Sequence, residues 1–569
     1  MDLLSELDGL VNKVRESGET DEERIRVIGQ YDRYFEKLSR ELGAFSAVSA
    51  GEPYPKEELY QALYDILQRN TDKELAPFEN LYDVFESGET KTNLTREELD
   101  RWGKDLHELA PRVPGTVMMD RTNDYLIEKL NSFGIETWTE PINFNGVFFH
   151  EWSLETTFPI SKKYICFPEN NVGFGDVTAE VADAGRGFED DYKDIDAAGK
   201  IVLINLGTII DHEGPCGKRE RYTLLHIYDI AYAHHVAGVI AYFEDTPGNT
   251  IKLLEPGIKP IGGSNIWGPG EVGSRHEFRV PVLNIGRQDA AEIKLLLAGG
   301  KTQAHLVIKG VRKVSTTNIV LGLLPGSGER AIAVGAHSCT AFEGAVCDGI
   351  GVVGTLALAK HFSAKPLEER PKSMLFFFDS FHVWGNCCQT ALTILDRYKT
   401  LSDKYDAFIW LDHIGNGKAD TLHSTTVSDN PVVWPLAAFS QFKYGIAPFV
   451  VPIVEIWSIC ATGAYQRIGI PTVTVQATDD NLLTPEDTWD KFDPDVVYRD
   501  ILAHVDLAEA LQKTEVPADQ PVEPFGGCGS LFTDLSQPEY PEGESYVPEK
   551  SYPLYVGGAE SKIRILERA

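Results

Sequence analysis

The chain has few basic residues for its length. Lysine and arginine together number 53 among 569 residues, against 86 aspartates and glutamates, and the formal net charge at pH 7 is -33. Contacts with nucleic-acid phosphates need a basic surface, and no stretch of this sequence forms a basic patch, so we expect no nucleic-acid partner. The acidic balance instead favours solubility and a neutral or cationic substrate.

The sequence also lacks a long hydrophobic run. No uninterrupted stretch of about 20 apolar residues occurs, so we expect no membrane-spanning helix. Residues 1–19 are acidic and have neither the basic start nor the apolar core of a signal peptide. The eight cysteines are irregularly spaced and contain no CxxC pair, which is typical of reduced thiols rather than of a disulfide framework. Together these absences predict a cytoplasmic protein.

The length of 569 residues exceeds the size at which a single hydrophobic core stops growing, so we expect several domains. The pattern predicts a helical region, the first part of an α/β domain, an inserted domain of short strands, the main part of the α/β domain, and a proline-rich extended tail. These regions cover residues 1–110, 111–150, 151–314, 315–513 and 514–569. Amphipathic helices dominate the first region, where Thr95 and Glu98 fit a capping box. We interpret it as a packing or oligomerisation element and expect a homo-oligomer.

Polar residues follow three buried strands of the predicted sheet. The strands are predicted from unbroken apolar runs at 331–336, 374–378 and 408–411. The polar residues that follow them are His337, Asp379, His382, Asp412 and His413. In an open α/β sheet, ligands and metals collect outside the carboxyl ends of the strands. We therefore expect His337, His382 and Asp412 to meet, together with Asp348, at one edge of a mostly parallel sheet.

Asp348 lies between the first two strands and begins a segment, GIGVVGTLALAKHF, that predicts a helix packed closely on the sheet through its small early residues. An aspartate at this position is explained equally well as a helix cap or as a metal ligand. His337 also fits a packed core histidine. His382 has the apolar sequence neighbours Phe381 and Val383, which also fit a histidine that is packed in an apolar core without a catalytic role.

The order of these parts resembles the M28-type zinc peptidases, which are aminopeptidases and carboxypeptidases, with an inserted protease-associated domain. The resemblance spans about residues 112–513 and rests on an ordered set of motifs. They are RTNDYLIEKLNSFGIE, GKIVLINLG, AGVIAYF, VPVLNIG, NIVLGLLPGSG, GAH at 335–337, FFFD, LDHIG, GIP at 469–471 and TPEDTWD at 484–490. The resemblance implies a mostly parallel α/β sheet of the zinc-aminopeptidase type, a β-rich inserted domain and a site for two zinc ions.

The resemblance also assigns roles to individual positions. It implies that His337, Asp348 and Asp412 are ligands of the first metal, although the spacing from Asp348 to the following glycine is one residue shorter than usual. The family's general base and the two residues that bind the second metal alone are replaced, and the three positions hold His382, Val383 and Leu483. Valine and leucine cannot hold a metal ion, so we expect one divalent ion, zinc, instead of two.

These residues predict a hydrolase that cleaves an amide or peptide-like bond in a small molecule or short peptide. A single metal would polarise the carbonyl, and His382 would accept the proton because its ordinary pKa of ~6.5 is near the working pH. His413 and Glu343 are the reserve catalytic candidates. Successive side chains of a strand point to opposite faces, which counts against His413 beside Asp412.

Two other functions stay open. The same fold could carry non-hydrolytic chemistry such as elimination, hydration or amide rearrangement, for which a histidine base with one metal or none would suffice. It could also serve as a non-catalytic binding scaffold, since the usual base and both second-metal ligands are replaced. Cys339, Cys347 and Cys460 are either soft ligands or nucleophiles, or small residues in tight turns.

Overall fold

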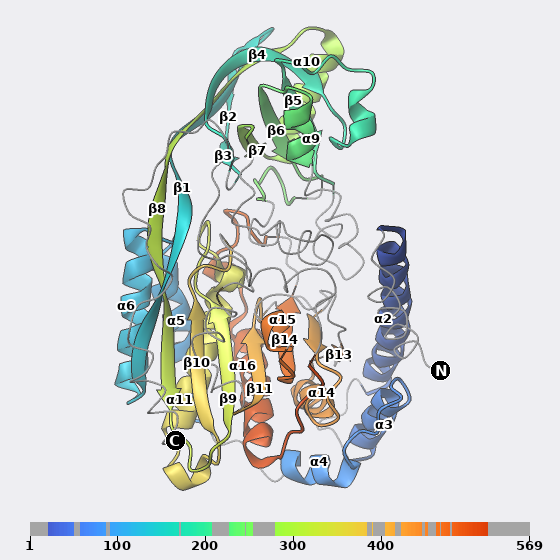
Figure 1. Cartoon of the computed structure of the whole chain (residues 1–569), viewed down its shortest axis with the longest axis vertical. Coiled ribbons are helices and arrows are strands. Elements are labelled where there is room, and N and C mark those ends of the chain that lie inside the picture. The colour runs from blue at the N-terminus through green and yellow to red at the C-terminus, as the bar shows by residue number, and fades with distance from the viewer. Residues whose placement is uncertain are drawn as a thin grey trace.

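The computed structural model shows a mixed α/β protein in which one hydrogen-bonded sheet runs through two parts of the molecule (Figure 1). The described residues are 21–49, 57–86, 92–169, 172–207, 227–244, 246–253, 279–383, 390, 404–415, 423–446, 450–452, 462–466, 468–477 and 481–521. The predicted proline-rich tail lies outside these residues from 522 onward. The last helix ends at Lys513, where the sequence predicts the end of the α/β domain.

The main sheet is mostly parallel, as the sequence predicts. Its strands are β8 (Gln303–Leu324), β9 (Ala331–His337), β10 (Ser373–Asp379), β11 (Tyr405–Leu411), β12 (His423–Val427), β13 (Val450–Pro452) and β14 (Thr472–Ala477). Their order is β13-β12-β14-β11-β9-β10-β8. The central strands β10, β9, β11 and β14 are parallel, whereas β8 and β12 run antiparallel to β10 and β14. Every residue of β9, β10 and β11 is buried, which explains their unbroken hydrophobicity.

Helices cover the main sheet. They are α6 (Val117–Ser132), α11 (Ile350–Ser363), α14 (Val433–Lys443), α15 (Thr462–Gln466) and α16 (Pro494–Lys513). Ile409 and Leu411 of β11 belong to the core that contains α11, α14 and α16, whereas Phe408 stacks on Tyr465 of α15. The segment Ala345–Ser363 is apolar and long enough to cross a membrane by composition, but 94% of its apolar window is buried inside the protein. It is packed as a core helix.

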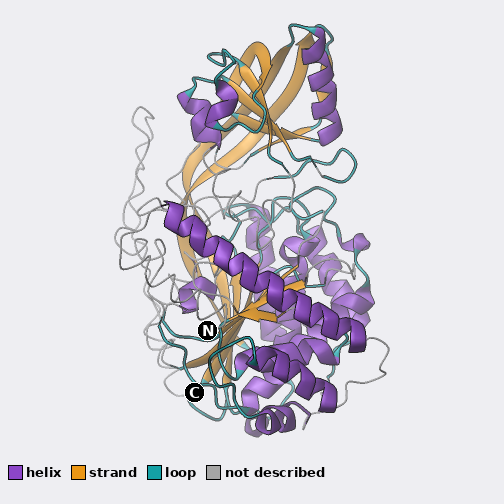
Figure 2. Cartoon of the chain, turned by 90° about the vertical axis from the view of Figure 1, so that its right-hand side faces the viewer, coloured by secondary structure: helices purple, strands orange, loops and turns teal. Residues whose placement is uncertain are grey.

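The N-terminal region is helical where it is described, as expected. Its helices are α2 (Asp21–Ser49), α3 (Glu57–Gln68), α4 (Phe78–Glu86) and α5 (Arg96–Glu108), and they lie against the main part (Figure 2). Tyr60 of α3 packs edge-on against Phe439 and Phe442 of α14. Thr95 caps α5 by accepting a hydrogen bond from the Glu98 amide, whereas the Glu98 carboxylate binds Lys360 of α11. These contacts make the region part of the same packed core.

The region predicted as an inserted domain, residues 151–314, forms the upper part of Figure 1. Its further elements are β1 (Glu136–Phe158), β2 (Lys162–Tyr164), β3 (Cys166–Pro168), β4 (Gly175–Asp183), β5 (Ile201–Asn205), α9 (Ile227–Ala233), β6 (Gly238–Tyr242), β7 (Val282–Ile285) and α10 (Arg287–Gly299). Strands β4 to β7 pair in parallel, and β3 pairs antiparallel with β7. The long antiparallel pair β1 and β8 joins both parts, so both expected boundaries fall inside strands.

One expected element in this region is wrong. The sequence up to AHHVAGVIAYF looks like one helix-like run, but α9 ends at Ala233 and Gly238–Tyr242 is strand β6. His235 takes a φ of 55°, a left-handed conformation in which the chain turns from helix to strand. The run is apolar because β6 is buried between β5 and β7, and short apolar runs do not distinguish a buried strand from a helix.

A buried ion pair between α11 and α16 gives a pH-dependent contribution to stability. Glu509 contacts His361 at 2.6 Å and Lys365 at 2.5 Å. Burial acts to raise the pKa of Glu509, but these two partners lower it below its ordinary value. An ionised Glu509 therefore favours the folded state above the unfolded pKa, and this contribution is lost as the pH falls through the lowered folded value.

We expect Glu509→Gln to lower stability by about 2 kcal/mol at pH 7 and to make stability fall less steeply below about pH 4.5. Urea unfolding between pH 3.5 and 7 would measure both effects. The exposed Glu368→Gln is the matched control and should change neither. An unchanged pH dependence in Glu509→Gln would contradict this assignment.

Candidate metal centre

Three ligand-type side chains meet at the carboxyl edge of the main sheet. His337 ends β9, and Asp412 and His413 follow β11, which lies beside β9 in the sheet. Asp412 Oδ1 lies 3.4 Å from His337 Nε2 and 3.1 Å from His413 Nε2. His337 and Asp412 are fully buried, and His413 is 5% exposed. One buried carboxylate thus lies between two buried imidazoles.

His337 is oriented by its other ring nitrogen. Nδ1 lies 3.0 Å from the carbonyl oxygen of Cys339, so Nδ1 carries the proton and Nε2 has a lone pair to offer. Burial lowers the pKa of His337, although Asp412 partly offsets this, and the ring is therefore neutral. Among the described residues, Nε2 has no partner that meets hydrogen-bond geometry. A neutral histidine held through Nδ1 with an unsatisfied Nε2 fits a metal ligand.

Asp348 joins three elements of the site. Its Oδ2 accepts a hydrogen bond from the His337 amide at 3.2 Å, and its Oδ1 accepts from the amides of Gly351 and His413 at 3.1 Å each. Burial, followed by the charge of Asp412, raises the pKa of Asp348 well above its ordinary value. Gly351 is required here because a Cβ would lie 2.0 Å from the Leu411 carbonyl oxygen and 2.4 Å from Asp348 Oδ1. The carboxylate therefore fixes the ends of β9 and β11 against α11.

A kinked π-helical turn, Ala345–Gly349, precedes α11, and its residues Cys347 (φ -103°, ψ 76°) and Asp348 (φ -135°, ψ 47°) have non-helical backbone angles at the kink. Asp487 holds this turn by accepting hydrogen bonds from the amides of Val346 at 2.8 Å and Cys347 at 3.1 Å. Asp487 belongs to the TPEDTWD motif. Its position in that motif is the only signal in the sequence that could have pointed to this role. The turn presents Cys347 and Asp348 to the edge of the sheet.

Arg112 holds the loop between β9 and the π-helical turn. Its buried guanidinium donates to the carbonyl oxygens of Ser338 at 2.7 Å, Glu343 at 2.9 Å, Gly344 at 3.0 Å and Leu106 at 3.2 Å. It thus ties α5 to the loop that carries Cys339. Nothing in the sequence singles out Arg112 for this role.

His382 lies against the proposed ligand His337. The two rings are stacked with centroids 4.3 Å apart and planes 6° apart, and Trp410 stacks on His382 at 5.7 Å. Burial, followed by the nearby His337, lowers the pKa of His382 well below its ordinary value. Neither ring nitrogen has a hydrogen-bond partner among the described residues. His382 is therefore a neutral imidazole whose burial disfavours the protonated form.

The positions that would bind a second metal are filled by apolar side chains. Val383 and Leu483 belong to one buried cluster, and both are at most 3% exposed. The other members of this cluster are Met119, Cys339, Val346, Cys347 and Leu482. The two residues that the resemblance assigns to a second metal are thus buried apolar side chains, which offer no ligand atoms.

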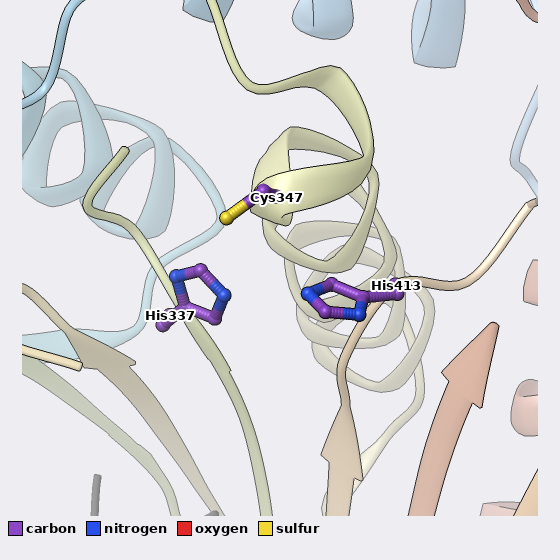
Figure 3. A group of neighbouring side chains, drawn as sticks. All are labelled: His337, Cys347 and His413. Carbon is purple, nitrogen blue, oxygen red and sulfur yellow. The ribbon is translucent and has the colours of Figure 1, made fainter. Parts of the chain in front are cut away.

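Two sets of side chains in the described residues have ligand atoms within 4.8 Å of one another. One is the predicted set of His337, Asp348 and Asp412. The other consists of His337, Cys347 and His413 (Figure 3). The alternation argument against His413 fails because β11 ends at Leu411 and His413 has a φ of 58°, which turns its ring toward the site. Both sets contain donors that zinc binds in proteins.

The other expected site residues lie elsewhere. Glu343 is not brought into either set, and its carboxylate lies 2.8 Å from Nδ1 of the half-exposed His107 on α5. Cys460 falls outside the described residues. Cys339 accepts a hydrogen bond from the Val383 amide and lies next to Nδ1 of His337, on the side of the ring that faces away from Asp412.

Solved structures of zinc peptidases share this fold. A peptidase M28 precursor from Shewanella amazonensis SB2B matches with a TM-score of 0.60 and 16% identity, covering 82% of this chain and 100% of that chain. BSAP, a zinc aminopeptidase from Bacillus subtilis, matches with a TM-score of 0.55 and 16% identity, covering 77% and 98%. An aminopeptidase from Aneurinibacillus sp. strain AM-1 matches with a TM-score of 0.50 and 20% identity, covering 75% and 95%.

No protein-family model matches the sequence, and a search of curated proteins finds no match. At identities of 16 to 20%, the matched structures establish the fold and leave the activity to be argued from the site. The predicted resemblance to M28-type zinc peptidases is thus confirmed for the fold.

Proposed function

We propose that the chain is a metal-dependent hydrolase that cleaves an amide or peptide-like bond with a single divalent ion, zinc. The observation that carries this proposal is the orientation of His337. Its Nδ1 is bound to a backbone carbonyl, and its unsatisfied Nε2 faces Asp412 beside His413. This arrangement lies at the carboxyl ends of parallel strands, where open α/β sheets collect their ligands.

The chain's own residues have distinct parts in this reaction. His337 and Asp412 would hold the ion, together with Asp348 as the sequence predicts. The chemistry that zinc supplies when bound is Lewis acidity toward a carbonyl oxygen and a lowered pKa for water. His382 accepts the proton of the attacking water and later returns it to the leaving amine. Burial keeps His382 neutral, and its stacking on His337 keeps it close to the ion.

The substrate class is supported by the matched structures, which are a peptidase and aminopeptidases. We propose a small or short peptide-like substrate, and a cytoplasmic, homo-oligomeric protein in keeping with the acidic composition. The full burial of the site gives some weight to the alternative, a binding scaffold without catalysis. Substrate turnover that is lost on chelation separates the two, because a binding scaffold can hold zinc without turning over a substrate.

We expect protein purified without chelator to contain about one zinc per chain, because the two ligand sets in the described residues share His337 and so cannot be filled separately. His337→Ala should lose the ion, since it removes the donor that both sets share. Elemental mass spectrometry measures this content. His361→Ala is the matched control, a buried histidine outside the centre, and should keep the ion. Wild-type protein that binds no zinc even after reconstitution would refute the proposal.

We expect His382→Gln to lower kcat by roughly 10²- to 10⁴-fold on any substrate found, because general-base catalysis contributes about that much. The zinc content should stay the same, since His382 is not a proposed ligand. Steady-state kinetics on a panel of aminoacyl amides and short peptides would test this. An unchanged kcat in His382→Gln would remove His382 from the mechanism without affecting the metal site.

A further inference from the structure

We propose that the metal centre is a His₂Cys site in which Cys347 supplies a thiolate and His337 and His413 supply imidazole nitrogens, while Asp348 acts as a backbone clamp. This inference rests on the proposed function only in requiring that an ion is bound. It changes the ligand set expected from the sequence, in which Asp348 is a ligand. It also gives His413 a metal-binding role instead of a catalytic one.

The geometry of the three side chains supports this set. Their ligand atoms all lie within 4.8 Å of one another, and all three residues are buried. In a tetrahedral zinc site with bonds of 2.0 to 2.3 Å, ligand atoms lie roughly 3.3 to 3.6 Å apart. Small side-chain rotations therefore bring the three donors onto one ion. Figure 3 shows the sulfur of Cys347 pointing toward His337, with the ring of His413 on the other side of the gap.

The hydrogen bonds of Asp348 argue for its role as a clamp. Both of its oxygens already accept backbone amides, from His337, Gly351 and His413. Moving this carboxylate onto an ion would stretch the bonds that hold β9 and β11 against α11. Cys347 is different, because its hydrogen bond to Asp487 is made by the backbone amide, and its thiol is one of three ligand atoms that lie within 4.8 Å of one another. The clamp and the thiolate thus have separate tasks on adjacent residues.

The surroundings of Cys347 suit a thiolate bound to a metal. The guanidinium of Arg112 lies close enough to interact electrostatically with Cys347. Cys347 also belongs to a buried apolar cluster that includes Val346, Val383 and Leu483. A soft sulfur donor in such a pocket selects zinc or cobalt over magnesium or manganese, which prefer oxygen ligands. The ligand set therefore predicts the metal preference as well as the site.

Cobalt substitution tests this set directly, because a thiolate bound to Co²⁺ gives a charge-transfer band in the near ultraviolet that oxygen and nitrogen ligands do not give. We expect the full-length wild-type protein titrated with Co²⁺ to show this band together with tetrahedral bands in the visible. Cys347→Ser should lose the near-ultraviolet band and bind zinc more than tenfold more weakly. Asp348→Asn should keep the band, and His413→Ala should weaken zinc binding.

Cys339→Ser is the matched control. Cys339 is equally buried and lies 4.0 Å from the other nitrogen of His337, so its loss should leave the band unchanged. If Cys347→Ser does not fold, X-ray absorption on the zinc-loaded wild type gives the same answer, because a bound thiolate adds a sulfur at about 2.3 Å.

The outcomes separate this inference from the proposed function. Cobalt binding without a charge-transfer band, or with a band that persists in folded Cys347→Ser, would overturn the His₂Cys site and leave the metal hydrolase standing. A band that disappears in Cys339→Ser instead would also overturn it. A wild-type protein that binds neither cobalt nor zinc would overturn both.

Discussion

Replacing Arg112 by methionine should destabilise the protein by roughly 3–6 kcal/mol, because it removes a charged donor from four buried carbonyl contacts. Two of these acceptors have a second donor, since the carbonyl of Leu106 accepts from Leu109 and that of Gly344 accepts from Gly349. The carbonyls of Ser338 and Glu343 would lose the donor that holds them. Methionine fills much of the space of arginine, so the main effect is the loss of hydrogen bonds.

The same substitution should also weaken metal binding. The loop held by Arg112 carries Cys339, whose carbonyl oxygen orients His337 through Nδ1. When the loop is released, His337 loses the hydrogen bond that fixes its ring. Loss of a hydrogen bond to the other nitrogen of a metal-binding histidine typically lowers metal affinity by about 10- to 100-fold. Urea unfolding and zinc titration measure the two effects on one sample.

Arg112→Lys and Arg101→Met are the comparisons that interpret this result. Lysine keeps the charge but has no planar fork of donors, so Arg112→Lys should lie between wild type and Arg112→Met. Arg101 is on the exposed side of α5, with its side chain 63% exposed, and its loss should cost no more than about 0.5 kcal/mol. Equal stability of wild type and Arg112→Met would show that Arg112 does not hold the loop.

The main sheet could be predicted because its strands are buried on both faces. The apolar runs at 331–336, 374–378 and 408–411 correspond to β9, β10 and β11, and the polar residues after them do meet at one edge. Register explains this, since His337 is paired with Asp379 at the ends of β9 and β10. In the inserted region, the buried strand β6 follows a short helix without a change in hydrophobicity, so periodicity alone could not separate them.

The candidate site was predictable only where residues follow strands directly. His337, Asp412 and His382 could be placed from strand ends, but the geometry of Cys347 and Asp348 depends on a π-helical turn that no periodicity predicts. The predicted direction of the His413 ring is wrong. Side chains alternate between faces only within a strand, and β11 ends at Leu411, after which His413 takes a φ of 58°. Arg112 could not have been found, since its contacts are with backbone carbonyls that are more than 200 residues away in three of four cases.

The apolar replacement of the second-metal ligands predicts a gain of function. Val383→Glu combined with Leu483→His should restore two of the donors that the resemblance places there, and zinc content should rise from about one to about two per chain. The backbone suits this change, because Leu483 has a φ of 58°, a left-handed conformation in which histidine is several-fold enriched over most residues. Without metal, two ionisable groups in an apolar cluster should cost on the order of 5 kcal/mol or more.

Zinc should therefore stabilise the double variant far more than it stabilises the wild type, because ligand binding adds to the stability of the folded state alone. Thermal unfolding with and without zinc, together with elemental analysis, measures both effects. Val383→Gln with Leu483→Gln is the matched control, since it introduces polar groups of similar size that bind zinc poorly, and its loss of stability should not be recovered. A folded double variant that still holds a single zinc would mean that Val383 and Leu483 do not occupy the second-metal position. The fold would then keep one metal site for a reason other than the loss of these two ligands.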